Sequence, residues 1–163
     1  MPTHAEGLLV AYGNQRLVEA NAEYRGYDLT PFWNRCGVAT ISPADIGKVI
    51  WLRRVYDDHV GEWLGPCLAV DVAAQSDFDR IVYEMHEVAE VPFWMAEMMG
   101  FVNGGWGQVY IGDCPPGNDS VPQAYAPERT EWQGEARPLF WPYPAQEWPV
   151  DCSKMRDHVR EMP

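Results

Sequence analysis

Short apolar runs separated by turn residues fill the first two thirds of the chain. The runs that are rich in β-branched and aromatic residues, as strands are, lie at residues 8–12, 37–41, 48–53, 67–72 and 108–111. Turn-forming residues interrupt the chain between them, as at Gly13-Asn14, Ser42-Pro43 and Gly65-Pro66. This pattern predicts a mainly β domain over residues 7–112.

Two segments among these runs have the spacing of helices rather than strands. The first predicts a helix over residues 77–87, because Ser76 and Asp79 resemble a capping box and the apolar residues after them recur along one helix face. These apolar residues are Phe78, Ile81, Val82, Met85 and Ala89. The second predicts a helix over residues 92–99, with Pro92 in its first turn and Gly100 as its C-terminal stop. We expect the methionines of this second helix to pack in the core.

The composition changes after residue 112. Nine of the fourteen prolines lie within residues 113–163, together with Trp132, Trp141 and Trp148. Repeated proline excludes long helices and central strands, so this region is predicted to be an extended Pro/Trp-rich arm. Because free linkers are poor in aromatic residues, we expect the arm to pack on the domain.

The charge balance narrows the classes of partner. The 163 residues include 24 acidic and 12 basic side chains, for a formal net charge of −12. Phosphate backbones and anionic membrane surfaces are bound by many Lys and Arg side chains, so neither nucleic acid nor such a membrane is an expected partner. No apolar run approaches the ~18 residues of a membrane span, so membrane insertion is not expected either. The acidity instead suits a neutral polysaccharide or a basic protein.

Four segments occur in a characteristic order. Residues 37–49 lead from an apolar strand through Ser42-Pro43 into Gly-Lys-Val, and residues 65–72 carry Asp71 near the end of another strand. Residues 89–101 lead from Glu90 into the second helix, and residues 107–111 have the sequence Gly-Gln-Val-Tyr-Ile. Together these segments resemble the double-psi β-barrel domains of rare lipoprotein A-like proteins, to which expansin-like and barwin-like barrels are related. The resemblance implies a six-stranded double-psi β-barrel with one or two short helices, and residues 113–163 have no counterpart in it.

The resemblance also places the family's catalytic aspartate at Asp71. Family members cleave glycan strands with this Asp and a nearby His, but Thr40 stands at the His position, and the resemblance therefore supports the fold more than the chemistry. Glu90 takes the place of an Asp that is largely structural in the family. From its chemistry alone, Asp71 is either a half-buried general acid with a raised pKa or a carboxylate held as a structural clasp. Cleavage by two carboxylates would need a second one, for which the candidates are Asp77, Asp79, Glu84, Glu87 and Glu90.

Four cysteines bear on the compartment. Cys36, Cys67, Cys114 and Cys152 are widely spaced and lack a C-x-x-C pair, which favours disulfides over a zinc site. The fold implied by the resemblance would pair Cys36 with Cys67 and Cys114 with Cys152, whereas four buried thiols in a cytosolic protein are the alternative. The first residues lack the basic region and the apolar core of a signal peptide. We still expect an extracellular or cell-envelope location, reached by another route or after removal of a leader.

Aromatic side chains are the candidate ligand-binding residues. The eight Trp residues exceed what one small barrel core needs, and sugar rings stack on such rigid apolar surfaces. Tyr56, Trp63 and Trp106 fall in predicted loops and are the candidates for binding a sugar. The alternative, of equal weight, is that the Pro/Trp-rich arm covers these side chains and forms a second small core with them. His86 and Glu90 would share a helix face and could hold zinc, but a third ligand is not evident and a solvated acidic face explains them better. We therefore predict neither a metal nor a cofactor.

Three functions fit these features. The leading hypothesis is a secreted barrel module that binds polysaccharide or another envelope component, without efficient catalysis. The first alternative is a structural subunit of an extracellular filament or surface layer that self-associates through the C-terminal arm. The second alternative is lytic transglycosylase-like cleavage of glycan by Asp71.

Overall fold

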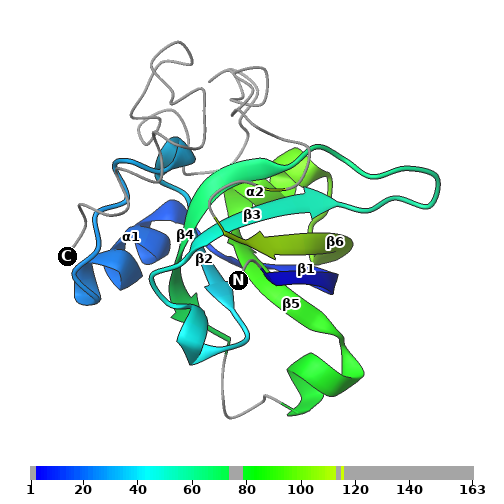
Figure 1. Cartoon of the computed structure of the whole chain (residues 1–163), viewed down its shortest axis with the longest axis horizontal. Coiled ribbons are helices and arrows are strands. Elements are labelled where there is room, and N and C mark those ends of the chain that lie inside the picture. The colour runs from blue at the N-terminus through cyan, green and yellow to red at the C-terminus, as the bar shows by residue number, and fades with distance from the viewer. Residues whose placement is uncertain (1–2, 74–78, 113–114, 116–163) are drawn as a thin grey trace.

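The protein is a closed β-barrel in the computed structural model, which describes residues 3–73, 79–112 and 115 (Figure 1). Helix α1 (Gln15–Tyr24) packs against the strands β2 (Gly37–Thr40) and β4 (Leu64–Val72). Helix α2 (Phe93–Met99) packs against β1 (Thr3–Gly13) and β5 (Glu87–Pro92). Single helical turns occur at Trp33–Arg35, Pro43–Asp45 and Arg80–Glu84. The strands of the barrel are β1 (Thr3–Gly13), β2 (Gly37–Thr40), β3 (Val49–Arg54), β4 (Leu64–Val72), β5 (Glu87–Pro92) and β6 (Gly104–Ile111).

The order of the strands around the barrel contains a repeat. Neighbouring strands follow the order β1-β5-β2-β4-β3-β6 and close on themselves. β1–β5 and β2–β4 are parallel pairs, and the other four pairs are antiparallel. Exchanging β1, β2 and β3 for β4, β5 and β6 reproduces both the cycle and the directions of pairing. The barrel is therefore two copies of one three-stranded arrangement, which is compatible with the double-psi barrel that the sequence predicts.

All five strands predicted from the apolar runs are present, and the mainly β, six-stranded barrel is confirmed. β5 was not predicted as a strand, and the helix expected over residues 77–87 is present in its described part only as a short helical turn. A single π-helical turn at Arg80–Glu84 ends before β5 begins at Glu87. The side chains of Glu87, Ala89 and Val91 are all buried on alternating positions, so the period of this segment is that of a strand. Residues 74–78 lie outside the described residues.

Trp106, expected to lie in a loop, lies near the start of β6. Gly105 and Gly107 make this possible, because a Cβ atom at Gly107 would overlap the side chain of Leu9 and one at Gly105 would overlap Arg54. Leu9 is fully buried inside the barrel. Glycine at these two positions therefore lets β6 lie close to β1 without a side chain on its inner face.

Helix α1 was not predicted, whereas α2 is confirmed. α1 begins after Asn14, whose side-chain Oδ1 accepts a hydrogen bond of 2.9 Å from the backbone N–H of Leu17, the usual function of asparagine at an N-cap. α2 ends at Gly100, which has φ 80° and so occupies the left-handed region that glycine favours. Met95 and Met99 of α2 are buried in the core as expected. Within the described residues, no helix has the length and apolar character needed to cross a bilayer.

Large aromatic side chains fill much of the core. Trp33 and Trp94 meet edge to face with ring centroids 5.2 Å apart. The Trp94 indole N–H donates to Gln15 Oε1 at 2.7 Å, and Gln15 Nε2 donates to the carbonyl of Arg35 at 2.9 Å. The buried polar atoms of Gln15 and Trp94 are thus satisfied by one another and by the backbone.

A disulfide joins the beginning of β2 to β4. Cys36 and Cys67 are bonded, with 31 residues separating them in the chain, as the sequence predicts. Cys114, Cys152 and the arm, apart from Pro115, lie outside the described residues. The second predicted disulfide therefore stays a prediction.

Candidate functional site

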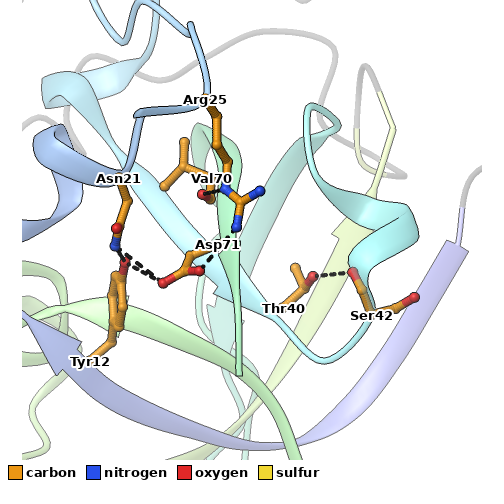
Figure 2. A network of polar contacts seen from close by, with 7 residues as sticks. All are labelled: Tyr12, Asn21, Arg25, Thr40, Ser42, Val70 and Asp71. Carbon is orange, nitrogen blue, oxygen red and sulfur yellow. Dashed lines mark hydrogen bonds and ion pairs between the residues drawn. The ribbon is translucent and has the colours of Figure 1, made fainter. Parts of the chain in front are cut away.

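A network of polar side chains surrounds Asp71 near the end of β4 (Figure 2). Its Oδ2 accepts hydrogen bonds of 3.2 Å from the Tyr12 hydroxyl and from Asn21 Nδ2. Its Oδ1 lies 3.5 Å from Nη2 of Arg25 in an ion pair. Asn21 Nδ2 also donates to the Tyr12 hydroxyl oxygen. We call these four residues, Tyr12, Asn21, Arg25 and Asp71, the Asp71 centre.

The fold brings these residues together from three elements. Tyr12 lies near the end of β1, and the chain then turns directly into α1 after the Asn14 cap. Asn21 and Arg25 are four residues apart, so they project from one side of the helix. Arg25 also donates from Nε to the carbonyl of Val70 at 2.7 Å, which holds the end of α1 against β4. The Asp71 side chain remains 27 % exposed and that of Arg25 31 %, so the centre is open to solvent on one side.

A second carboxyl group, Glu90, lies close enough to interact with this centre. Ala39 of β2 pairs with Asp71 on one side and with Glu90 on the other, so the two carboxyl groups flank the same point of β2. Burial, and next the charge of Asp71, raise the pKa of Glu90. Burial and the Asp71 charge likewise raise the pKa of the Tyr12 hydroxyl, which stays a neutral donor. Of the four candidates for a second carboxylate that the structure describes, Glu90 is the one that it brings to Asp71.

Thr40, which stands at the family's His position, takes no part in the Asp71 centre. Its side chain is 2 % exposed, and its hydroxyl donates to the carbonyl of Ser42 at 3.2 Å. In Figure 2 this hydroxyl points toward Ser42 and away from Asp71. Among the described residues, the Asp71 centre therefore has a fixed carboxylate with the carboxyl group of Glu90 nearby, and no imidazole.

The other acidic candidates do not join the Asp71 centre. Asp79 and Glu84 lie at the two ends of the π-helical turn before β5, and Asp77 lies outside the described residues. Glu87 is 3 % exposed, and its Oε2 has no hydrogen-bond partner among the described residues. Burial, together with the charge of Glu90, raises the pKa of Glu87 to about 7, although Arg80 partly opposes this.

This buried carboxyl group gives the protein a pH-dependent stability. The folded chain holds the Glu87 proton up to about pH 7, whereas the unfolded chain releases it near the ordinary value of 4.5. The folded state therefore binds more protons in this window, and stability falls as the pH rises from 4.5 to 7, by about 3 kcal/mol from this group. We expect Glu87→Gln to remove this loss in urea unfolding compared at about pH 5 and pH 8. Glu84→Gln, on the exposed turn, is the control; equal losses in wild type and Glu87→Gln would contradict the prediction.

His86 and Glu90, considered above as possible zinc ligands, do not lie on a common helix. His86 follows the π-helical turn with φ 59°, and Glu90 lies within β5, so the two residues do not share a helix face. Within the described ranges, no group of three or more His, Cys, Asp or Glu side chains is arranged to hold a metal ion.

The three aromatic candidates lie in different settings. Trp63 is only 6 % exposed, with Arg53 4.3 Å above its ring and Tyr110 6.0 Å away in an edge contact; it belongs to the core and has no open face. Tyr56 is 40 % exposed and stacks on His59, with ring centroids 4.5 Å apart. Trp106 is 41 % exposed and lies on β6.

Sequence reasoning identified Asp71 but not its partners. Tyr12, Asn21 and Arg25 are 59, 50 and 46 residues away from Asp71 in the chain, and no local pattern links them to it. The available signal was Asn14 before a segment with Asn21 and Arg25 at helical spacing. That signal would have predicted α1 and one polar face on it.

The fold and the site define a closed, mixed six-stranded β-barrel with a fixed, partly exposed carboxylate beside a second carboxyl group. No protein-family model matches the sequence, and no curated protein or solved structure matches it either.

Proposed function

We propose that the protein is an extracellular or cell-envelope barrel module that binds neutral polysaccharide at the Asp71 centre, without efficient catalysis. The observation that carries this proposal is the partly exposed Asp71 carboxylate, fixed by Tyr12, Asn21 and Arg25, with no imidazole beside it in the described part of the chain. The double-psi character, and with it the relation to rare lipoprotein A-like and expansin-like barrels, is part of the same proposal. The Cys36–Cys67 disulfide supports an oxidising compartment.

The chemistry of the Asp71 centre suits sugar hydroxyl groups. A hydroxyl both donates and accepts, and the centre offers a carboxylate acceptor beside amide and guanidinium donors. These side chains hold one another in place, so binding orders few additional groups. The net charge of −12 repels anionic glycans and leaves neutral ones as the favoured class.

Replacing Asp71 by asparagine tests this proposal. We expect Asp71→Asn to keep the fold and to bind neutral polysaccharide about tenfold more weakly, because hydrogen bonds to a charged group contribute roughly 1.5–3 kcal/mol. The measurement is affinity for a panel of neutral and anionic polysaccharides, with circular dichroism as the check on folding. Asp58→Asn is the matched control, because Asp58 is 86 % exposed and contacts only His59 in the ion pairs of the described residues. The proposal fails if wild type binds no neutral polysaccharide, or if Asp71→Asn binds as well as wild type.

One observation favours cleavage as a second candidate function. Glu90, whose pKa is raised by burial and next by the charge of Asp71, lies across β2 from Asp71, so two carboxyl groups stand close together, as glycan cleavage requires. New chain ends released from the same polysaccharides by wild type, and absent with Glu90→Gln, would establish it. The assembly hypothesis depends on the C-terminal arm, which lies almost wholly outside the described residues, and it stays a prediction.

A further inference from the structure

A second polar and aromatic surface lies on strands that do not carry Asp71. Glu6 on β1 pairs directly with Gln108 on β6, and Gln108 pairs directly with Arg53 on β3. Gln108 Nε2 donates to Glu6 Oε1 at 2.6 Å, and Arg53 Nε donates to Gln108 Oε1 at 2.7 Å. Three side chains are therefore joined in a row across three neighbouring strands. We call these residues, together with Trp106, the outer ladder.

Trp106 completes the outer ladder on β6. It lies two residues before Gln108 and so on the same face of the strand. Its indole N–H donates to Glu6 Oε2 at 3.1 Å, and the ring of His86 approaches it edge to face at 6.5 Å. The hydrogen bond fixes one edge of the indole, while 41 % of the residue stays exposed. Both carboxylate oxygens of Glu6 thus position neighbouring groups of the outer ladder.

Around Trp106, β6 carries side chains only on its outer face. Gly105 and Gly107 flank Trp106 and point into the barrel, where neither has room for a side chain. At residues 105–108 the strand therefore presents Trp106 and Gln108 outward and no side chain inward. At the far end of the outer ladder, Arg53 turns onto the buried Trp63, which separates the exposed part from the core.

We propose that the outer ladder is a second glycan-binding surface, on which one sugar ring of a neutral oligosaccharide stacks on Trp106 while its hydroxyls bond Glu6 and Gln108. The inference rests on the proposed function, since it assigns the same class of ligand to a separate surface. The C–H face of a sugar stacks on an indole that is already immobile. The carboxylate and carboxamide beside it accept and donate to the hydroxyls at the rim of the same ring. The carboxylate of Glu6 disfavours acidic sugars.

Binding stoichiometry separates the two surfaces. Calorimetric titration of the full chain with a short neutral oligosaccharide is expected to find two binding sites per chain in wild type. Trp106→Ala and Gln108→Ala are each expected to weaken binding at the outer ladder about tenfold. Asp71→Asn is expected to weaken binding at the Asp71 centre instead. Tyr56→Ala is the matched control, because it removes a ring of nearly equal exposure (40 %) on a different segment. Circular dichroism checks that each variant is folded.

Each failure has a different signature. One site in wild type that is lost with Asp71→Asn and kept in Trp106→Ala would overturn the outer ladder alone. One site that is lost with Trp106→Ala and kept in Asp71→Asn would support the outer ladder and overturn binding at Asp71. The outer-ladder proposal would also be overturned if the second site were lost in Tyr56→Ala and kept in Trp106→Ala. The outer ladder would likewise be overturned if Trp106→Ala lost binding to a polylysine probe and wild type bound no glycan.

Discussion

Replacing Trp94 by alanine is expected to lower the free energy of unfolding by about 4 kcal/mol, the usual scale for removing a fully buried tryptophan. Trp94 is 1 % exposed and meets Trp33 edge to face. Its loss also leaves the Oε1 of fully buried Gln15 without its donor, which adds a desolvation cost. The measurement is urea unfolding followed by circular dichroism.

The neighbouring residue provides the control for Trp94. Phe93 lies on the same helix but is 46 % exposed, so we expect Phe93→Ala to cost less than about 1 kcal/mol. If the two variants unfold at the same urea concentration, α2 does not dock through Trp94 in the way described.

Removing the Cys36–Cys67 disulfide is expected to cost a similar amount. The bond closes a segment of 31 residues, and the chain-entropy model gives about 4 kcal/mol for a loop of that length. Alanine is the better replacement, because both sulfur atoms lie in fully buried residues and a serine hydroxyl there would need a partner. We expect Cys36→Ala/Cys67→Ala to unfold at a clearly lower urea concentration than wild type.

Dithiothreitol extends this experiment to the remaining cysteines. If the double variant loses further stability on reduction, the predicted Cys114–Cys152 disulfide exists and contributes to the fold. If the double variant is as stable as oxidised wild type, the Cys36–Cys67 bond does not constrain the unfolded chain as described.

Five strands could be predicted because runs of β-branched and aromatic residues mark them in the sequence. β5 and α1 lack such a clear local pattern and were missed. Residues 48–53 combine β-branched and aromatic residues and form β3. β5 begins with the charged Glu87, and the apolar positions before it happened to have helical spacing. Helix α1 buries only Gln15, Val18 and Ala22, too few apolar positions to form a periodic pattern.

The candidate site was predictable in one residue and not in its surroundings. Asp71 stood out because it interrupts an apolar strand, a local feature of the chain. Its ion pair with Arg25 depends on how α1 packs against β4, which a sequence of one protein does not reveal. The burial of Trp63 could not be predicted for the same reason, because Arg53 and Tyr110, which contact its ring, lie on other segments.

The pairing of β1 has a consequence for the order in which the barrel is built. β1 hydrogen-bonds only to β5 and β6 among the strands of the described residues, so it gains its first partner only when the chain has been synthesised to about Pro92 and its second when the chain reaches about Ile111. The native contacts of β1 span most of the domain, and such long-range contacts slow folding. Until β6 is made, one edge of β1 stays open. An open strand edge can pair with other chains, so we expect the barrel to be most exposed to aggregation before β6 closes the ring.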